Sequence, residues 1–135
     1  MGKTAERRKF KRVEFQSKIQ YKDFYNPLKV YRTATCLNMG MAGGCFETFE
    51  NVRLDKILTI LVNIPMAYSY QVVPAKIFAK VIYSRKQEGK QYRIGVHFIA
   101  IDRKGIIAIG QMVDRALRGA TKTATTQKKL EKTAA

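Results

Sequence analysis

A regular alternation of apolar and polar residues runs through positions 13–22. Val13, Phe15, Ile19 and Tyr21 share one face with Ser17, and the residues between them are polar or charged. A period of two is typical of a β-strand that covers a core with one side. The stretch therefore predicts a strand with one buried face.

Five further stretches have the composition of strands. They are rich in β-branched and aromatic residues or alternate in the same way, and they cover 28–37, 44–49, 57–64, 72–84 and 91–99. Asn26-Pro27 and Glu88-Gly89-Lys90 are turn signals, and a glycine-rich stretch at 38–44 separates the second and third strands. The fifth strand is long enough to bend, and we expect a disturbance near Pro74.

The period changes near the C-terminus. Asp102 is a candidate N-cap and Gly119 a candidate stop for a helix. Between them, apolar residues recur at helical spacing: Ile106, Ile109, Val113, Ala116 and Leu117. The sequence thus predicts a mainly β protein, a six-stranded antiparallel β-barrel with a C-terminal α-helix packed against it.

The chain divides into three predicted parts. Residues 1–12 form a flexible basic arm, 13–118 the barrel and helix, and 119–135 a disordered basic tail, because the tail has too few large apolar residues to form a core. With 135 residues and 46% apolar content, the chain suits one globular domain. Its net charge of +16 favours anionic partners, namely nucleotides, nucleic acid, acidic proteins or anionic lipid.

Several classes of protein are disfavoured. No apolar run approaches the ~18 residues of a membrane span. Cys36, Cys45 and His97 are too few to form a zinc site or a disulfide framework, so we expect no metal and a reduced, cytoplasmic setting. No nucleophile–base pair or paired carboxylates stand at useful spacing, so we expect no enzyme and no catalytic residue.

Two short motifs carry the candidate chemistry. Arg8 and Arg12 supply planar guanidinium groups four residues apart, which can bind a phosphate or a guanine edge through two hydrogen bonds. Asn38 supplies an amide, and Gly40 and Gly43 allow a ligand to approach the backbone closely. An anion that carries a purine could use all of these groups.

In this order, the two motifs resemble those of the PilZ domain, a bacterial receptor for cyclic di-GMP. The family pairs Arg-x-x-x-Arg with a later Asp/Asn-x-Ser-x-x-Gly, and the resemblance covers roughly residues 6–118. It implies a six-stranded barrel whose N-terminal arm wraps over the ligand. It also implies that Arg8 and Arg12 contact guanine and phosphates, that Asn38 binds a guanine edge, and that Gly43 closes the motif. Gly40 departs from the pattern, because it stands where the family has serine.

Three functions follow from these observations. The first is a cyclic di-GMP receptor or adaptor that acts on an unidentified effector protein in motility, adhesion or exopolysaccharide control. The second is a PilZ-like interaction module that no longer binds nucleotide, which Gly40 motivates. The third is a basic barrel that binds nucleic acid, motivated by the net charge. Cyclic di-GMP would be a ligand, and no cofactor is expected.

Overall fold

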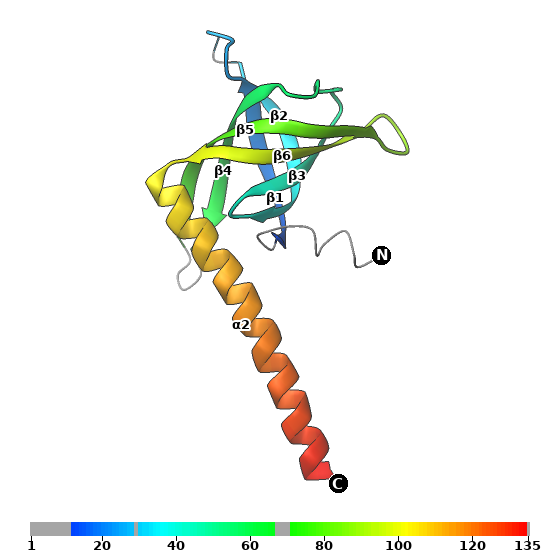
Figure 1. The fold of residues 1–135 in the computed structure, drawn as a ribbon, viewed down its shortest axis with the longest axis vertical. Coiled ribbons are helices and arrows are strands. Elements are labelled where there is room, and N and C mark those ends of the chain that lie inside the picture. Colours follow the sequence, from blue (N-terminus) through cyan, green and yellow to red (C-terminus); the bar gives the residue numbers. More distant parts are fainter. Residues whose placement is uncertain (1–11, 29, 67–70, 135) are drawn as a thin grey trace.

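The computed structural model describes residues 12–28, 30–66 and 71–134, with side chains as far as Arg118. Six antiparallel strands in these ranges close into a barrel in the order β1-β2-β3-β6-β5-β4, and a helix follows the last strand (Figure 1). The elements are β1 Arg12–Asp23, β2 Arg32–Gly40, β3 Gly43–Thr48, β4 Ile57–Pro65, β5 Val72–Lys86, β6 Tyr92–Ile101 and α2 Arg103–Ala134. The predicted barrel with a C-terminal helix is confirmed.

The alternating face of β1 forms part of the barrel core. Phe15, Ile19 and Tyr21 are buried, whereas Gln16, Lys18 and Gln20 between them are exposed. The other strands contribute inward side chains in the same way, because successive residues of a strand point to opposite faces. The largest fully buried side chains are Tyr21, Phe46, Leu58, Ile64, Ile77, Ile94, Ile109, Val81 and Val96.

The second strand begins later than the sequence predicts, at Arg32 instead of residue 28. Two turns in which a side chain accepts from the backbone lengthen the preceding loop. Asp23 Oδ1 accepts from Tyr25 N, and Asn26 Oδ1 accepts from Leu28 N, both at 3.0 Å. Such turns compete with strand pairing, so Leu28 remains exposed in the loop.

The glycine-rich turn is tighter than predicted. Asn38 and Gly40 belong to β2, and β3 begins at Gly43, so Met41 and Ala42 alone connect the strands. The backbone groups next to the turn are paired. Gly40 pairs with Arg12 of β1.

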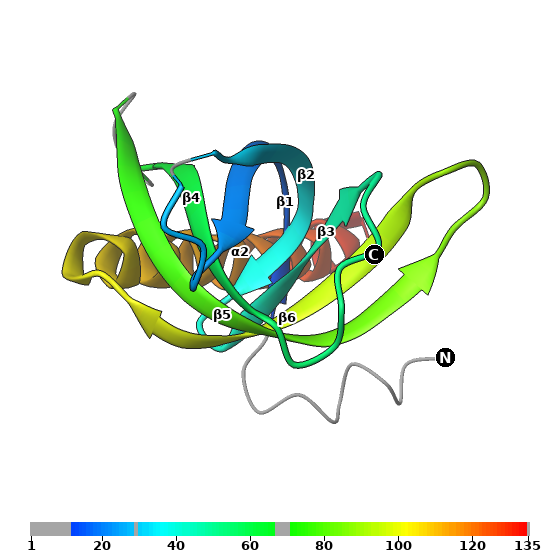
Figure 2. The same ribbon diagram turned by 90° about the horizontal axis from the view of Figure 1, so that it is seen from above.

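The predicted disturbance of β5 at Pro74 is not found. Pro74 pairs with Asn63 of β4 in regular register, and it precedes Ile77, where pairing with β6 begins. The register of β5 shifts instead between Phe78 and Ala79 and again after Val81. Beyond these bulges the β5–β6 hairpin extends past the barrel wall (Figure 2) and turns at Gly89, whose φ is 80°.

Helix α2 begins as predicted, because Asp102 Oδ1 caps it by accepting from Gly105 N at 3.0 Å. Its buried face differs from the prediction. Ala108 and Ile109 are buried, whereas Ile106 and Leu117 are exposed. Leu117 is exposed because the helix packs on the barrel with its first turns and then extends away from it (Figure 1). Ile106 is in the first turns but on another side of the helix than Ala108 and Ile109, which contact the core.

The helix also continues past Gly119, the predicted stop, to Ala134. One glycine costs only about 1 kcal/mol within a helix, and the alanine, lysine and glutamine residues beyond it are good helix formers. Disorder of 119–135 in solution stays a prediction, as does flexibility of the basic arm, of which residues 1–11 lie outside the described ranges.

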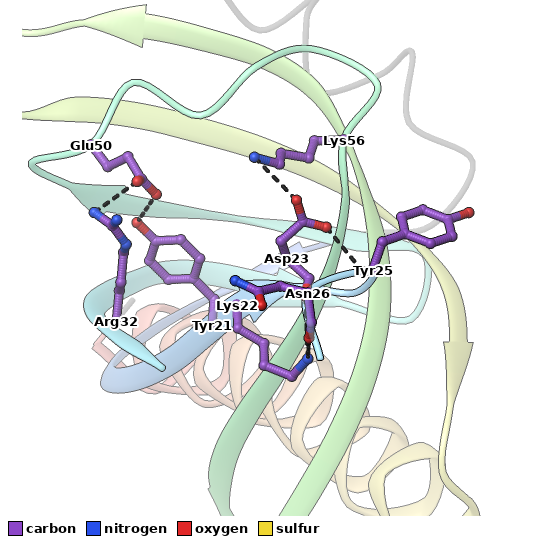
Figure 3. A network of polar contacts seen from close by, with 8 residues as sticks. All are labelled: Tyr21, Lys22, Asp23, Tyr25, Asn26, Arg32, Glu50 and Lys56. Atoms are coloured by element: carbon purple, nitrogen blue, oxygen red, sulfur yellow. Dashed lines mark hydrogen bonds and ion pairs between the residues drawn. The ribbon is translucent and has the colours of Figure 1, made fainter. Parts of the chain in front are cut away.

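A polar network closes the barrel at the loops that follow β1 and β3 (Figure 3). Tyr21 Oη donates to Glu50 Oε1 at 3.0 Å and lies 2.9 Å from Thr48 Oγ1. Glu50 also pairs with Arg32 at 2.7 Å. Burial, followed by the neighbouring Glu50 carboxylate, raises the pKa of Tyr21 to about 12, although the hydrogen bond with Thr48 lowers it.

Both cysteines are buried free thiols. Burial, with the nearby Cys45 as a smaller cause, raises the pKa of Cys36 to about 12, so Cys36 stays protonated and unreactive. Among the described residues, no helix has the length and hydropathy needed to cross a bilayer.

Candidate functional site

The two motifs meet on the outer wall of the barrel at the β2–β3 hairpin. Arg12 is the first residue of β1, and its Cα lies opposite that of Gly40. The guanidinium of Arg12 reaches across to Gly43, with Nη2 3.0 Å from the point that a Cβ on Gly43 would occupy. Arg12, Gly40 and Gly43 are therefore brought together. Arg8 lies outside the described residues.

Asn38 occupies the next outward position along the hairpin. Its Cα lies opposite Glu14 of β1 and Cys45 of β3. Asn38 Oδ1 is buried and has no hydrogen-bond partner within the described part of the chain. An unpaired buried acceptor costs about 1–3 kcal/mol, so such atoms are rare in folded proteins and call for an explanation. A donor from a ligand would satisfy it.

Both strands are irregular next to this position. The register shifts between Glu14 and Ser17 in β1, and between Cys36 and Asn38 where β2 pairs with β3. Bulges of this kind re-aim side chains and are common beside functional sites. They place Asn38 and Arg12 on the outer wall together.

Position 43 requires glycine because the backbone of β6 lies very close to it. A Cβ at this position would clash with the carbonyl oxygen of Val96 in β6, and φ at Gly43 is not positive. A Cβ on Gly44 would lie 2.8 Å from the carbonyl oxygen of Asn38. The fold thus requires at least Gly43 for strand packing, whether or not a ligand binds.

The sequence did not identify three neighbours of these residues. Glu14 and His97 are exposed, and Cys45 is buried beneath the hydroxyl of Tyr83, which donates to its Sγ at 3.4 Å. His97 lies opposite Gly43 on β6. Register between distant strands brings these groups to the site, and no local pattern in the sequence encodes it.

The groups gathered here are of the kinds that contact planar, anionic ligands. A guanidinium group pairs with phosphate or stacks on a base, and an amide oxygen accepts from a base edge. A separate hollow of about 690 Å³, lined by residues such as Lys18, Gln20, Asn63 and Lys76, contains none of the motif residues.

The fold and this site define a class of small closed barrels. Its members carry an arginine at the start of the first strand and a glycine-rich hairpin on the outer wall. A sequence model of the PilZ domain matches residues 6–115, and the chain belongs to the PilZ domain family. Comparison with curated protein sequences found no match.

Solved structures with the same fold include two bacterial proteins. The Bacillus subtilis inhibitor of motility, MotI/DgrA, superposes with a TM-score of 0.68 and 12% sequence identity over 84% of this chain and 52% of that one. Borreliella burgdorferi PlzA, solved in complex with c-di-GMP, superposes with a TM-score of 0.52 and 13% sequence identity over 87% of this chain and 55% of that one. The present chain therefore spans about half the length of each.

Proposed function

We propose that this protein is a cyclic di-GMP receptor that passes the signal on through contact with a partner protein. Membership of the PilZ family supports the ligand, as does the c-di-GMP complex of PlzA, which has the same fold. The similarity to an inhibitor of motility supports an adaptor role in processes such as motility, adhesion or exopolysaccharide control. In this role the protein is not an enzyme, and cyclic di-GMP is a ligand and not a cofactor.

The observation that carries the proposal is the meeting of Arg12, Gly43 and Asn38 on one wall, where Asn38 Oδ1 has no hydrogen-bond partner among the described residues. Arg12 pairs with a phosphate or stacks on guanine, and its fork geometry cannot be replaced by lysine. Asn38 Oδ1 accepts from a guanine edge. Gly40 and Gly43 let the ligand lie against the hairpin backbone, and Arg8 adds a second guanidinium from the arm.

The hairpin also gives the site a route to α2. Met41, in the turn of the motif, packs against the core, as do Met112 and Val113 of α2. Its Sδ lies 3.9 Å from the point that a Cβ on Gly110 would occupy. A ligand that orders the hairpin would therefore alter the support of α2, the element that extends away from the barrel (Figure 1).

A second candidate function is a PilZ-type interaction module without nucleotide binding. Gly40 favours it, because the missing serine hydroxyl removes one hydrogen bond, worth about 1–3 kcal/mol or about 5- to 150-fold in affinity. Glycine also loosens the free loop and adds an ordering cost. Once a partner is known, this module would bind it equally with and without the dinucleotide.

Titration calorimetry with cyclic di-GMP tests the receptor proposal. We expect saturable heat at micromolar ligand, and amide hydrogen exchange in the first turns of α2 should slow on binding. The absence of heat at tens of micromolar protein would reject the receptor and leave the interaction module. Binding without any change in exchange would reject the route through Met41.

A further inference from the structure

An acidic residue faces the basic site. Glu14 follows Arg12 by two positions on β1, so both side chains point to the outer wall. The Cα of Glu14 lies directly opposite that of Asn38, which puts their Cβ atoms about 5 Å apart. Within the described part of the chain, Glu14 makes no side-chain hydrogen bond or ion pair.

This carboxylate is unexpected if the site does no more than attract phosphate. A negative charge beside a phosphate repels it, and the repulsion weakens binding of an anionic ligand. Ten acidic residues stand against 26 basic ones in the chain, and one of the ten is next to the motif amide. The acid therefore either lowers affinity or makes a contact that outweighs the repulsion.

Glu14 and Asn38 together present neighbouring acceptors. An ionised carboxylate only accepts hydrogen bonds. The Oδ1 atom of Asn38 is a buried acceptor that no donor from residues 12–28, 30–66 or 71–118 satisfies. Guanine has donors at N1 and at the 2-amino group, side by side on one edge. Adenine has an acceptor at N1 and no 2-amino group, so it offers these acceptors no matching pair.

We propose that Glu14 is a specificity-determining residue, whose carboxylate accepts from the N1–H and 2-amino group of a guanine that also contacts Asn38. This inference rests on the proposed cyclic di-GMP function and adds a contact outside both motifs. Sites built to hydrogen-bond a ligand group strongly reject analogues that lack the group, because the protein acceptors are then left unpaired. Glu14 thus selects cyclic di-GMP over cyclic di-AMP.

The register irregularities support this geometry. In the β1–β2 pairing the shift begins immediately after Glu14, and in the β2–β3 pairing it ends at Asn38. The two side chains are therefore opposite one another where the local ladder is distorted, and there a bulge can turn both toward one ligand edge.

The test is calorimetry on the full chain with three ligands: cyclic di-GMP, cyclic di-AMP and cyclic di-IMP, in which hypoxanthine lacks the 2-amino group. Wild type is compared with Glu14→Gln and Glu88→Gln. Glu88 is exposed in the β5–β6 hairpin, so its substitution changes the net charge equally without touching the site. Thermal melts of each variant confirm folding.

For the change in cyclic di-GMP affinity caused by Glu14→Gln, the proposal and simple electrostatics predict opposite signs. If Glu14 contacts guanine, Glu14→Gln weakens cyclic di-GMP binding about tenfold or more although it removes a repulsive charge, and Glu88→Gln leaves it within about twofold. Wild type binds cyclic di-IMP more weakly than cyclic di-GMP, and the difference between these two affinities is smaller for Glu14→Gln.

Equal or tighter binding of cyclic di-GMP by Glu14→Gln overturns the proposed role of Glu14 and leaves the receptor proposal in place. Equal binding of cyclic di-GMP and cyclic di-AMP by wild type also overturns the role of Glu14 and leaves the receptor proposal in place. If wild type binds none of the three ligands, both the receptor proposal and this inference fail.

Discussion

The guanidinium of Arg12 lies 3.0 Å from the point at which a side chain on Gly43 would begin. These residues are 31 positions apart, as their numbers show, and belong to different strands of one barrel wall. Arg12 ends the first motif and Gly43 ends the second, so their proximity brings the two motifs together. The backbone between Gly43 and β6 has no room for a larger residue, so packing and the site depend on the same position.

The first prediction concerns this close approach. Gly43→Ala should destabilise the fold by about 1–3 kcal/mol, because the new methyl group would clash with the Val96 carbonyl. Gly110→Ala is the matched control. Its methyl group would meet only Met41 Sδ at 3.9 Å, an ordinary contact, and alanine favours a helix by up to about 1 kcal/mol.

Thermal or urea unfolding measures both variants. The two melting temperatures should shift in opposite directions, downward for Gly43→Ala and upward for Gly110→Ala. A Gly43→Ala variant as stable as wild type would show that the β3–β6 contact is looser than described.

Tyr21 gives a prediction about pH. Its pKa is raised to about 12 in the folded state, from about 10 when unfolded. Between these values the folded protein keeps a proton on Tyr21 that the unfolded chain has lost. The contribution of Tyr21 to the free energy of unfolding is therefore present below pH 10 and is lost as pH rises toward 12. Two pKa units correspond to about 2–3 kcal/mol.

Tyr21→Phe isolates this contribution from the other groups that titrate at high pH. The free energy of unfolding in urea should fall less steeply between pH 10 and 12 for Tyr21→Phe than for wild type. Parallel pH profiles would mean that Tyr21 ionises at its ordinary pKa.

Another prediction comes from restoring the family's serine at position 40. Gly40→Ser puts back the hydroxyl of the family motif next to Arg12, and we expect cyclic di-GMP to bind about 5- to 150-fold more tightly. Calorimetry measures the change, and circular dichroism checks the fold, because Gly40 is buried. Unchanged affinity in a folded variant would show that the missing serine does not limit binding.

The alternation in β1 was enough to predict a strand with Phe15, Ile19 and Tyr21 inside, because a period of two maps directly onto the faces of a strand. Boundaries were harder to predict. Asn38 and Gly40 have the composition of a turn, yet pairing with β1 keeps both in β2. Side-chain turns at Asp23 and Asn26 carried the loop beyond the Asn26-Pro27 turn signal and delayed β2.

Long-range effects explain the remaining differences. Ile106 matched the helical period but is exposed, because the direction in which α2 leaves the barrel decides which of its sides is buried. The motifs predicted Arg12, Asn38 and Gly43 as candidate site residues, together with Arg8 and Gly40. Glu14 and His97 became visible as neighbours only through the register of β1 with β2 and of β3 with β6.

The most direct test of the receptor proposal is calorimetry with cyclic di-GMP on Arg12→Ala, Arg12→Lys and Arg53→Ala. Arg53 is exposed in the loop after β3, so its removal changes the charge equally, away from the site. The account predicts that Arg12→Ala binds about 10- to 100-fold more weakly than wild type, that Arg12→Lys rescues little, and that Arg53→Ala stays within about twofold. Wild-type affinity in Arg12→Ala, or equal losses in Arg12→Ala and Arg53→Ala, would contradict it.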